Sequence, residues 1–101
     1  MKIWYVYMIQ SSRDQSTYTG ITTDLLTRIT AHNSGKGAKH TKARRPYKLL
    51  GYRVLEGRSF ASKLEATVKR RSHDEKLALA SVRTWQGPLV ELINKILSQT
   101  T

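Results

Sequence analysis

Cysteine is absent from the 101 residues, which excludes a disulfide framework and thiolate sites for zinc or iron–sulfur clusters. Apolar runs are short as well, because none approaches the roughly 20 residues of a membrane-spanning helix. The run at residues 3–9 resembles the apolar part of a signal peptide, but residues 10–14 supply no cleavage site of small residues. We therefore expect a soluble protein without a membrane partner. Its lack of cysteine is compatible with the reducing cytoplasm, where we place it.

Acidic residues are also scarce. The chain has 7 acidic and 18 basic residues and a formal net charge of +11. Charge of this size repels itself, so it favours a polyanionic partner, with nucleic acid ahead of an anionic membrane surface. The 31 residues between Asp24 and Glu56 contain eight lysines and arginines but no carboxylate.

The densest part of this basic stretch is a glycine-containing loop at residues 34–46, which we predict to follow a DNA backbone. Each phosphate contact would add about 0.9 to the magnitude of the slope of log K against log salt concentration for binding to duplex DNA. The alternative is a solvated basic loop with no ligand. The predicted nucleic-acid-binding residues are Lys36, Lys39, His40, Lys42, Arg44 and Arg45.

The order of β-prone and amphipathic stretches predicts the fold class. The first strand is apolar on both alternating faces, which suits a strand covered on both sides. The predicted strands are residues 3–9, 17–22 and 47–55. The predicted helices begin at Leu25, where Asp24 can cap the helix, and continue with residues 59–71, residues 74–82 and a segment after Gly87-Pro88. Strands interleaved with helices in a chain of this length predict one α+β or mixed α/β domain with a small sheet.

Two tyrosines, Tyr7 and Tyr18, lie at matching depths of the first two predicted strands, which form a hairpin. Arg28 and His32 are four residues apart and project from one side of the first helix. Arginine matches a phosphate with a fork of donors, and histidine can orient a substrate or transfer a proton near neutral pH. The phenols become candidate bases if guanidinium and metal charge favour the phenolate. Packing within the sheet is the alternative role for both tyrosines.

Glu65 is a carboxylate isolated among the basic residues of the second predicted helix. A single carboxylate can hold Mg²⁺ when water and substrate phosphate complete the coordination shell. The alternative is structural, since Ser62 and Glu65 have the spacing of a capping box, in which the glutamate only reaches back to a helix-start amide. A helix that starts at Ser59 would instead place Glu65 inside the helix, free to face the sheet.

A family resemblance rests on residues that occur in a fixed order: Tyr5-Val6-Tyr7, Tyr18-Thr19-Gly20, Arg28, His32 and Glu65. This set, with the Ser-Gly-Lys-Gly-Ala-Lys stretch at residues 34–39, resembles the GIY-YIG nuclease family and more closely its small stand-alone bacterial branch (UPF0213-like). The likeness spans residues 3–82. Tyr5-Val6 replaces Gly-Ile and Thr19 replaces Ile, so Tyr7, Tyr18 and Gly20 are the identities with the two triplets.

The resemblance implies a three-stranded antiparallel sheet flanked by helices, with an extra C-terminal helix outside the minimal domain. It also implies a catalytic set. In the family the glutamate ligates one divalent ion, Mg²⁺ or Mn²⁺, the arginine contacts the scissile phosphate, and one of the two tyrosines is the general base. Which tyrosine has that role is left open, and Asn94 in the extra helix has no assigned partner. The implied catalytic residues are Tyr7, Tyr18, Arg28, His32 and Glu65, with Glu65 as the metal ligand.

We therefore predict a metal-dependent DNA endonuclease that is selective for DNA structure and linked to DNA repair or recombination. Its nuclease domain is predicted at residues 1–83, with a helical extension at residues 84–101 packed on the same domain. One alternative is a nucleic-acid-binding module with little or no turnover. Another is a nuclease subunit whose C-terminal helix contacts a second copy or a partner protein.

Overall fold

The first strand of the chain forms the centre of the sheet. The computed structural model describes residues 2–99, apart from the side chain of His40. Its strands lie in the order β2-β1-β3, and both pairs are antiparallel. The strands are β1 (Ile3–Ser11), β2 (Thr17–Thr22) and β3 (Tyr47–Glu56). This three-stranded antiparallel sheet between helices confirms the predicted α+β fold.

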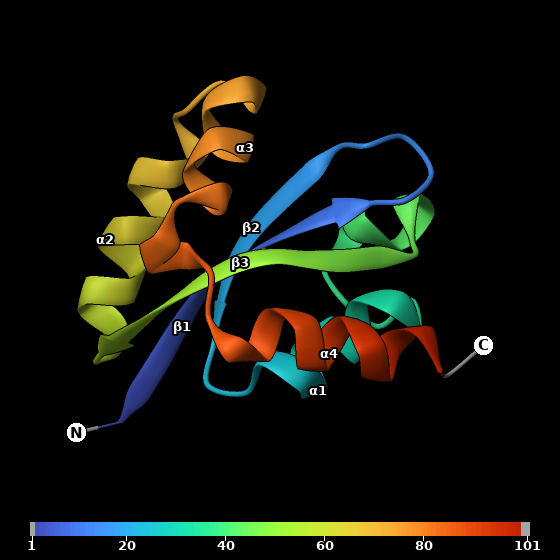
Figure 1. Ribbon diagram of the computed structural model, residues 1–101, viewed down its shortest axis with the longest axis horizontal. Helices are drawn as coiled ribbons and strands as arrows, with labels where there is room; N and C mark the ends of the chain where they lie inside the picture. The colour runs from blue at the N-terminus through green and yellow to red at the C-terminus, as the bar shows by residue number, and fades with distance from the viewer. Residues whose placement is uncertain (1, 100–101) are drawn as a thin grey trace.

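Helices cover both faces of the sheet, with α1 and α4 on one face and α2 and α3 on the other (Figure 1). The predicted basic loop is not entirely irregular, because it contains a short 3-10 helix, η1. The helices are α1 (Leu25–Asn33), η1 (Lys39–Arg44), α2 (Arg58–Lys69), α3 (His73–Ser81), η2 (Arg83–Trp85) and α4 (Pro88–Ser98). Among residues 2–99, every helix falls short of the length and apolar character that crossing a membrane requires.

β1 is apolar on both faces because each face meets a different layer of helices. Tyr7 and Ile9 are buried in a core cluster with residues of α1 and α4. Val6 and Met8 are buried in a second cluster that includes Trp85 and residues of α2 and α3. The alternation in the sequence therefore predicted a strand covered on both sides, and this is confirmed.

The start of α2 decides between the two interpretations of Glu65. The helix begins at Arg58, so Glu65 lies in its interior and takes no part in capping. The alternative of a capping box with Ser62 is therefore excluded, and the interpretation with a helix start near Ser59 is confirmed. A capping box forms instead at the start of α3, where Ser72 and Glu75 each accept a hydrogen bond from the other's backbone N–H.

Two asparagines close the free edge of β3. Asn33, at the end of α1, donates to the Tyr47 carbonyl at 3.1 Å and accepts from the Tyr47 N–H at 2.7 Å. Asn94 of α4 makes the same pair of bonds with Leu49, at 2.9 Å and 2.8 Å. Tyr47 and Leu49 are two residues apart, so their backbone groups face the same side of the strand, away from β1. The side-chain amides thus take the place of a neighbouring strand, which gives Asn94 a structural role.

α4 packs on the same domain through its apolar face. Ile93 is buried in the core cluster that contains Tyr7, and Leu89, Val90 and Leu97 pack against that cluster. This packing accounts for the apolar stripe of the helix without a partner molecule. The boundary between residues 83 and 84 stays a prediction, as does a partner on the exposed side of the helix.

We expect Asn94→Ala to lower the free energy of unfolding by about 1–3 kcal/mol, because it leaves the N–H and carbonyl of Leu49 without their partners. The measurement is urea unfolding followed by circular dichroism. Lys95→Ala is the matched control, since Lys95 is exposed on the same helix and its loss should change stability by no more than about 0.5 kcal/mol. Equal stability of the two variants would contradict the assigned role of Asn94.

Candidate active site

The two tyrosines of the candidate site lie diagonally across the β1–β2 pair. The register places Tyr7 opposite Gly20 and Ile9 opposite Tyr18. The prediction that Tyr7 and Tyr18 lie at matching depths of the two strands is therefore wrong. Their ring centroids are 6.4 Å apart. A Cβ atom on Gly20 would lie 2.6 Å from the Tyr7 hydroxyl oxygen and 3.1 Å from the Tyr18 ring. Glycine at this position therefore leaves the space in which the two phenols meet.

α1 brings a histidine and an arginine to the Tyr7 hydroxyl. Asp24 caps this helix as predicted, by accepting from the Thr27 N–H. His32 Nε2 lies 2.8 Å from the Tyr7 hydroxyl oxygen, and Arg28, one turn earlier, is close enough to lower the pKa of Tyr7. Tyr7 is 1% exposed and His32 is fully buried, so this contact lies inside the core.

Burial keeps Tyr7 protonated in the free protein. The pKa of Tyr7 is raised to about 12, mainly by desolvation and to a smaller extent by the nearby Tyr18 and Glu65. The hydrogen bond and positive charge of Arg28 act in the opposite direction but do not offset the burial. The guanidinium thus favours the phenolate, as expected from the sequence, but burial outweighs it and the phenol stays neutral. Arg28, Tyr18 and Glu65 all lie close enough to the Tyr7 phenol to shift its pKa.

Tyr18 lies closer to the surface and contacts His32 from β2. The ring centroids of Tyr18 and His32 are 5.1 Å apart, and Tyr18 is half-buried. The ammonium of Lys69 lies 5.8 Å from the centre of the Tyr18 ring. Lys69 also forms an ion pair with Glu65 at 3.3 Å, where the Glu65 side chain is 22% exposed. The structure thus brings all five predicted catalytic residues into one region between β1, β2, α1 and α2.

The donor set at Glu65 suits a hard cation. Among the described residues, no group of three or more His, Cys, Asp and Glu side chains is placed to hold a metal ion. A metal ion at Glu65 would therefore have one protein carboxylate, with water and substrate phosphate as its remaining ligands, which is a coordination that Mg²⁺ accepts. In the structure this carboxylate is paired with the Lys69 ammonium.

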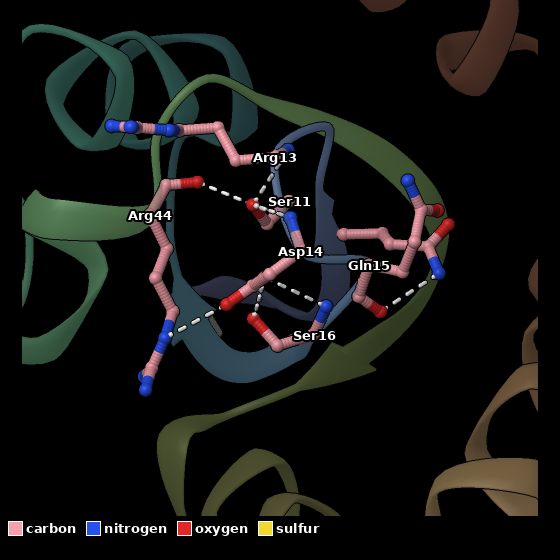
Figure 2. Close-up of polar contacts among 7 residues, drawn as sticks. Ser11, Arg13, Asp14, Gln15, Ser16 and Arg44 are labelled. Atoms are coloured by element: carbon pink, nitrogen blue, oxygen red, sulfur yellow. Dashed lines mark hydrogen bonds and ion pairs between the residues drawn. The ribbon is translucent and has the colours of Figure 1, made fainter.

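The predicted nucleic-acid-binding residues fall into two groups. Lys36, Lys39, Lys42 and Arg45 are exposed, and the side chain of His40 lies outside the described part of the chain. Arg44 is held by the hairpin turn instead, through an ion pair with Asp14 at 3.1 Å (Figure 2).

Figure 2 shows how this turn is organised. Ser11 donates its hydroxyl to the Arg44 carbonyl and accepts from the Arg13 and Asp14 N–H groups. The hydroxyl and N–H of Ser16 bond to the Asp14 carboxylate. Mainly through these Ser16 bonds, with a smaller contribution from Arg44, the pKa of Asp14 is lowered to about 2. The end of the basic loop is thereby anchored to the turn between β1 and β2.

Two residues of this region were not predicted from the sequence, Lys69 and Thr41. Lys69 follows Glu65 by four residues, and this spacing is a recognisable signal for an ion pair on a helix. Thr41 had no such signal. Its hydroxyl lies 2.8 Å from His32 Nδ1, a contact that depends on how the loop folds back over α1.

The arrangement matches a known class of domain. Residues 3–78 match the model of the GIY-YIG catalytic domain. The chain therefore belongs to the GIY-YIG family. Within it, the chain is similar to UPF0213 proteins. It is 44% identical over 78 residues to one from Cupriavidus necator, covering 77% of this chain and 84% of that protein. It is 42% identical over 79 residues to one from Staphylococcus haemolyticus, covering 78% and 95%.

A solved structure extends the similarity to the whole fold. The solution structure of a UPF0213 protein from Bacillus halodurans is 37% identical in sequence, with a TM-score of 0.53. The match covers 98% of this chain and 99% of that one. It therefore includes α4, which lies beyond the part matched by the catalytic-domain model.

We expect Tyr7→Phe to change how stability depends on pH. The pKa of Tyr7 is about 12 in the folded protein and about 10 in an unfolded chain. The stability that comes from the buried neutral phenol is thus complete below about pH 10 and is lost as the pH rises towards about 12. Between about pH 9 and pH 11.5 the wild type should lose about 2 kcal/mol more unfolding free energy than the variant, measured by urea unfolding. Equal losses of unfolding free energy in the two proteins would show that the pKa of Tyr7 is not raised in the folded state.

Proposed function

We propose that this protein is a metal-dependent DNA endonuclease that hydrolyses phosphodiester bonds and leaves 5′-phosphate and 3′-hydroxyl ends. The observation that carries the proposal is the surroundings of Tyr7. Its hydroxyl contacts His32, and Arg28, Tyr18 and Glu65 lie within electrostatic range. A proton acceptor, a phosphate-binding cation and a carboxylate within reach of one phenol suit phosphodiester hydrolysis.

Tyr7 and His32 act together in the proposed proton transfer. Tyr7 passes its proton to His32 Nε2, which lies 2.8 Å away, and then accepts a proton from the attacking water. The excess proton thus resides on the imidazole, and the phenol is neutral again. This route avoids a free phenolate in the resting protein, where the pKa of Tyr7 is about 12. Tyr7 is therefore favoured over Tyr18 as the general base.

Arg28 and Glu65 act on the phosphate. Arg28 never loses its charge and can hold two phosphate oxygens, so it stabilises the negative charge that builds up during attack. Glu65 would hold one Mg²⁺ or Mn²⁺ ion, which supplies further charge stabilisation when bound. Tyr18 and Lys69 border the approach to Glu65.

The exposed lysines of the basic loop provide the proposed contacts to the DNA backbone. Lys36, Lys39 and Lys42 are exposed on the segment that folds back over α1. Phosphate contacts of this kind position a duplex without reading its sequence. This favours selection of DNA by structure, as in repair or recombination, and we place the activity in the cytoplasm.

A binding module without turnover is the second candidate. The ion pair between Glu65 and Lys69 favours it, because it occupies the carboxylate that would hold the metal ion. In that case the basic loop would bind DNA and Tyr7 would be a packing residue. Steep salt dependence of binding together with no cleavage of any DNA form would select this function.

Glu65→Gln should abolish cleavage while leaving binding intact. We expect nicking of supercoiled, branched or single-stranded DNA with Mg²⁺ to fall by at least about 100-fold, because charge stabilisation at the phosphate is lost. Gel assays measure the cleavage, and fluorescence anisotropy measures the binding. Glu91→Gln is the matched control on the exposed side of α4 and should cut like the parent. Parental activity in Glu65→Gln would show that the cleavage does not come from this site.

The double variant Lys39→Ala/Lys42→Ala should bind DNA more weakly than the parent. The dependence of this binding on Mg²⁺ should stay the same. If both side chains contact phosphates, the slope of log Kd against log salt should fall by about 0.9 for each. Lys76→Ala on α3 is the control and should leave the slope unchanged. An unchanged slope in the double variant would mean that this part of the loop does not bind the backbone.

A further inference from the structure

Thr41 closes the side of His32 that faces away from Tyr7. Its hydroxyl oxygen lies 2.8 Å from His32 Nδ1 and donates to the Ala38 carbonyl at 2.8 Å. Both Thr41 and His32 are fully buried, so water does not compete for these contacts. The loop passes directly behind the ring, since a Cβ atom on Gly37 would lie 2.2 Å from His32 Nδ1.

The direction of these bonds follows from the number of hydrogens. A threonine hydroxyl has one hydrogen, which Thr41 gives to the Ala38 carbonyl, so its oxygen can only accept from His32. His32 must then carry its hydrogen on Nδ1. In the neutral imidazole this leaves Nε2 as an acceptor, and Nε2 is the nitrogen that faces Tyr7.

The surroundings of the Tyr7 hydroxyl support the same tautomer. Arg28 lowers the pKa of Tyr7, and because arginine is only a donor, the phenol oxygen is the acceptor towards Arg28. The remaining hydrogen of the buried phenol needs an acceptor, and His32 Nε2 is 2.8 Å away. If Nε2 carried the hydrogen instead, two donors would face the Tyr7 oxygen, and the phenol hydrogen would lose this acceptor.

We propose that Thr41 is a positioning residue that holds His32 in the Nδ1–H tautomer, so that Nε2 is ready to take the proton of Tyr7. Once His32 has accepted that proton, both ring nitrogens carry hydrogen, and the Thr41 oxygen still accepts from Nδ1. Thr41 therefore serves the neutral and the charged imidazole alike. The role in catalysis rests on the proposed nuclease function, whereas the tautomer does not.

The first test is therefore independent of activity. Nitrogen-15 NMR of labelled histidine distinguishes the two tautomers, and a His40→Gln/His73→Gln background leaves His32 as the single histidine of the chain. We expect Nδ1 of His32 to carry the hydrogen. In Thr41→Val, which keeps the shape but removes the hydroxyl, the Nε2–H form should become populated, and Thr41→Ser should restore the parental spectrum. An Nε2–H tautomer in the parent, or an unchanged tautomer in Thr41→Val, would overturn the proposal.

The second test measures cleavage of the DNA substrate on which the parent protein is active. Thr41→Val should lower kcat by about ten- to a hundred-fold with KM within about twofold, since loss of an orienting partner commonly has an effect of this size. Thr41→Ser should retain near-parental kcat. Parental kcat in Thr41→Val, or equal loss in both variants, would overturn the catalytic role. A parent protein that cuts no DNA would refute the nuclease function and leave the NMR result to decide the tautomer.

Discussion

The hydrogen bond between the Tyr7 hydroxyl and the His32 imidazole is the contact on which the rest of the site depends. It joins the central strand to the first helix in the interior of the protein, where a polar atom without a partner is costly. Each group therefore constrains the next, from Arg28 through Tyr7 and His32 to Thr41. The contacts from Tyr7 through His32 to Thr41 connect three parts of the molecule, which are the sheet, α1 and the basic loop.

The fold separates the reactive groups from most of the positive charge. Tyr7 and His32 are enclosed, whereas Tyr18 and Glu65 lie nearer the surface on the side of β2 and α2. The lysines of the basic loop are outside, but the backbone of the same loop forms the wall behind His32. A ligand that binds the lysines would thus act on a segment that also touches His32.

Much of the fold and of the site could be predicted because the residues concerned lie on regular elements. Alternation along β1 gave the two buried faces, and a spacing of four placed Arg28 and His32 on one side of α1. The diagonal placement of Tyr7 and Tyr18 could not be predicted in the same way. It depends on the pairing register of the hairpin, which the turn at residues 11–16 sets.

The contacts that were missed are those between distant parts of the chain. Thr41 reaches His32 only because the glycine-containing loop bends back over the ring, and Asn94 reaches Leu49 across 45 residues. Neither contact follows a helical or strand period, so no pattern in the sequence points to it. The basic composition of the loop was visible, but the anchoring of Arg44 by Asp14 depends on how the loop meets the hairpin turn.

The asparagines on β3 also limit how copies of this molecule can associate. An exposed strand edge offers free N–H and carbonyl groups to any extended chain, and pairing of such edges leads to domain swapping or fibrils. Asn33 and Asn94 occupy those groups at Tyr47 and Leu49 from within the same molecule. This part of the sheet therefore cannot grow by adding another strand, which limits the association of copies of this protein through β3.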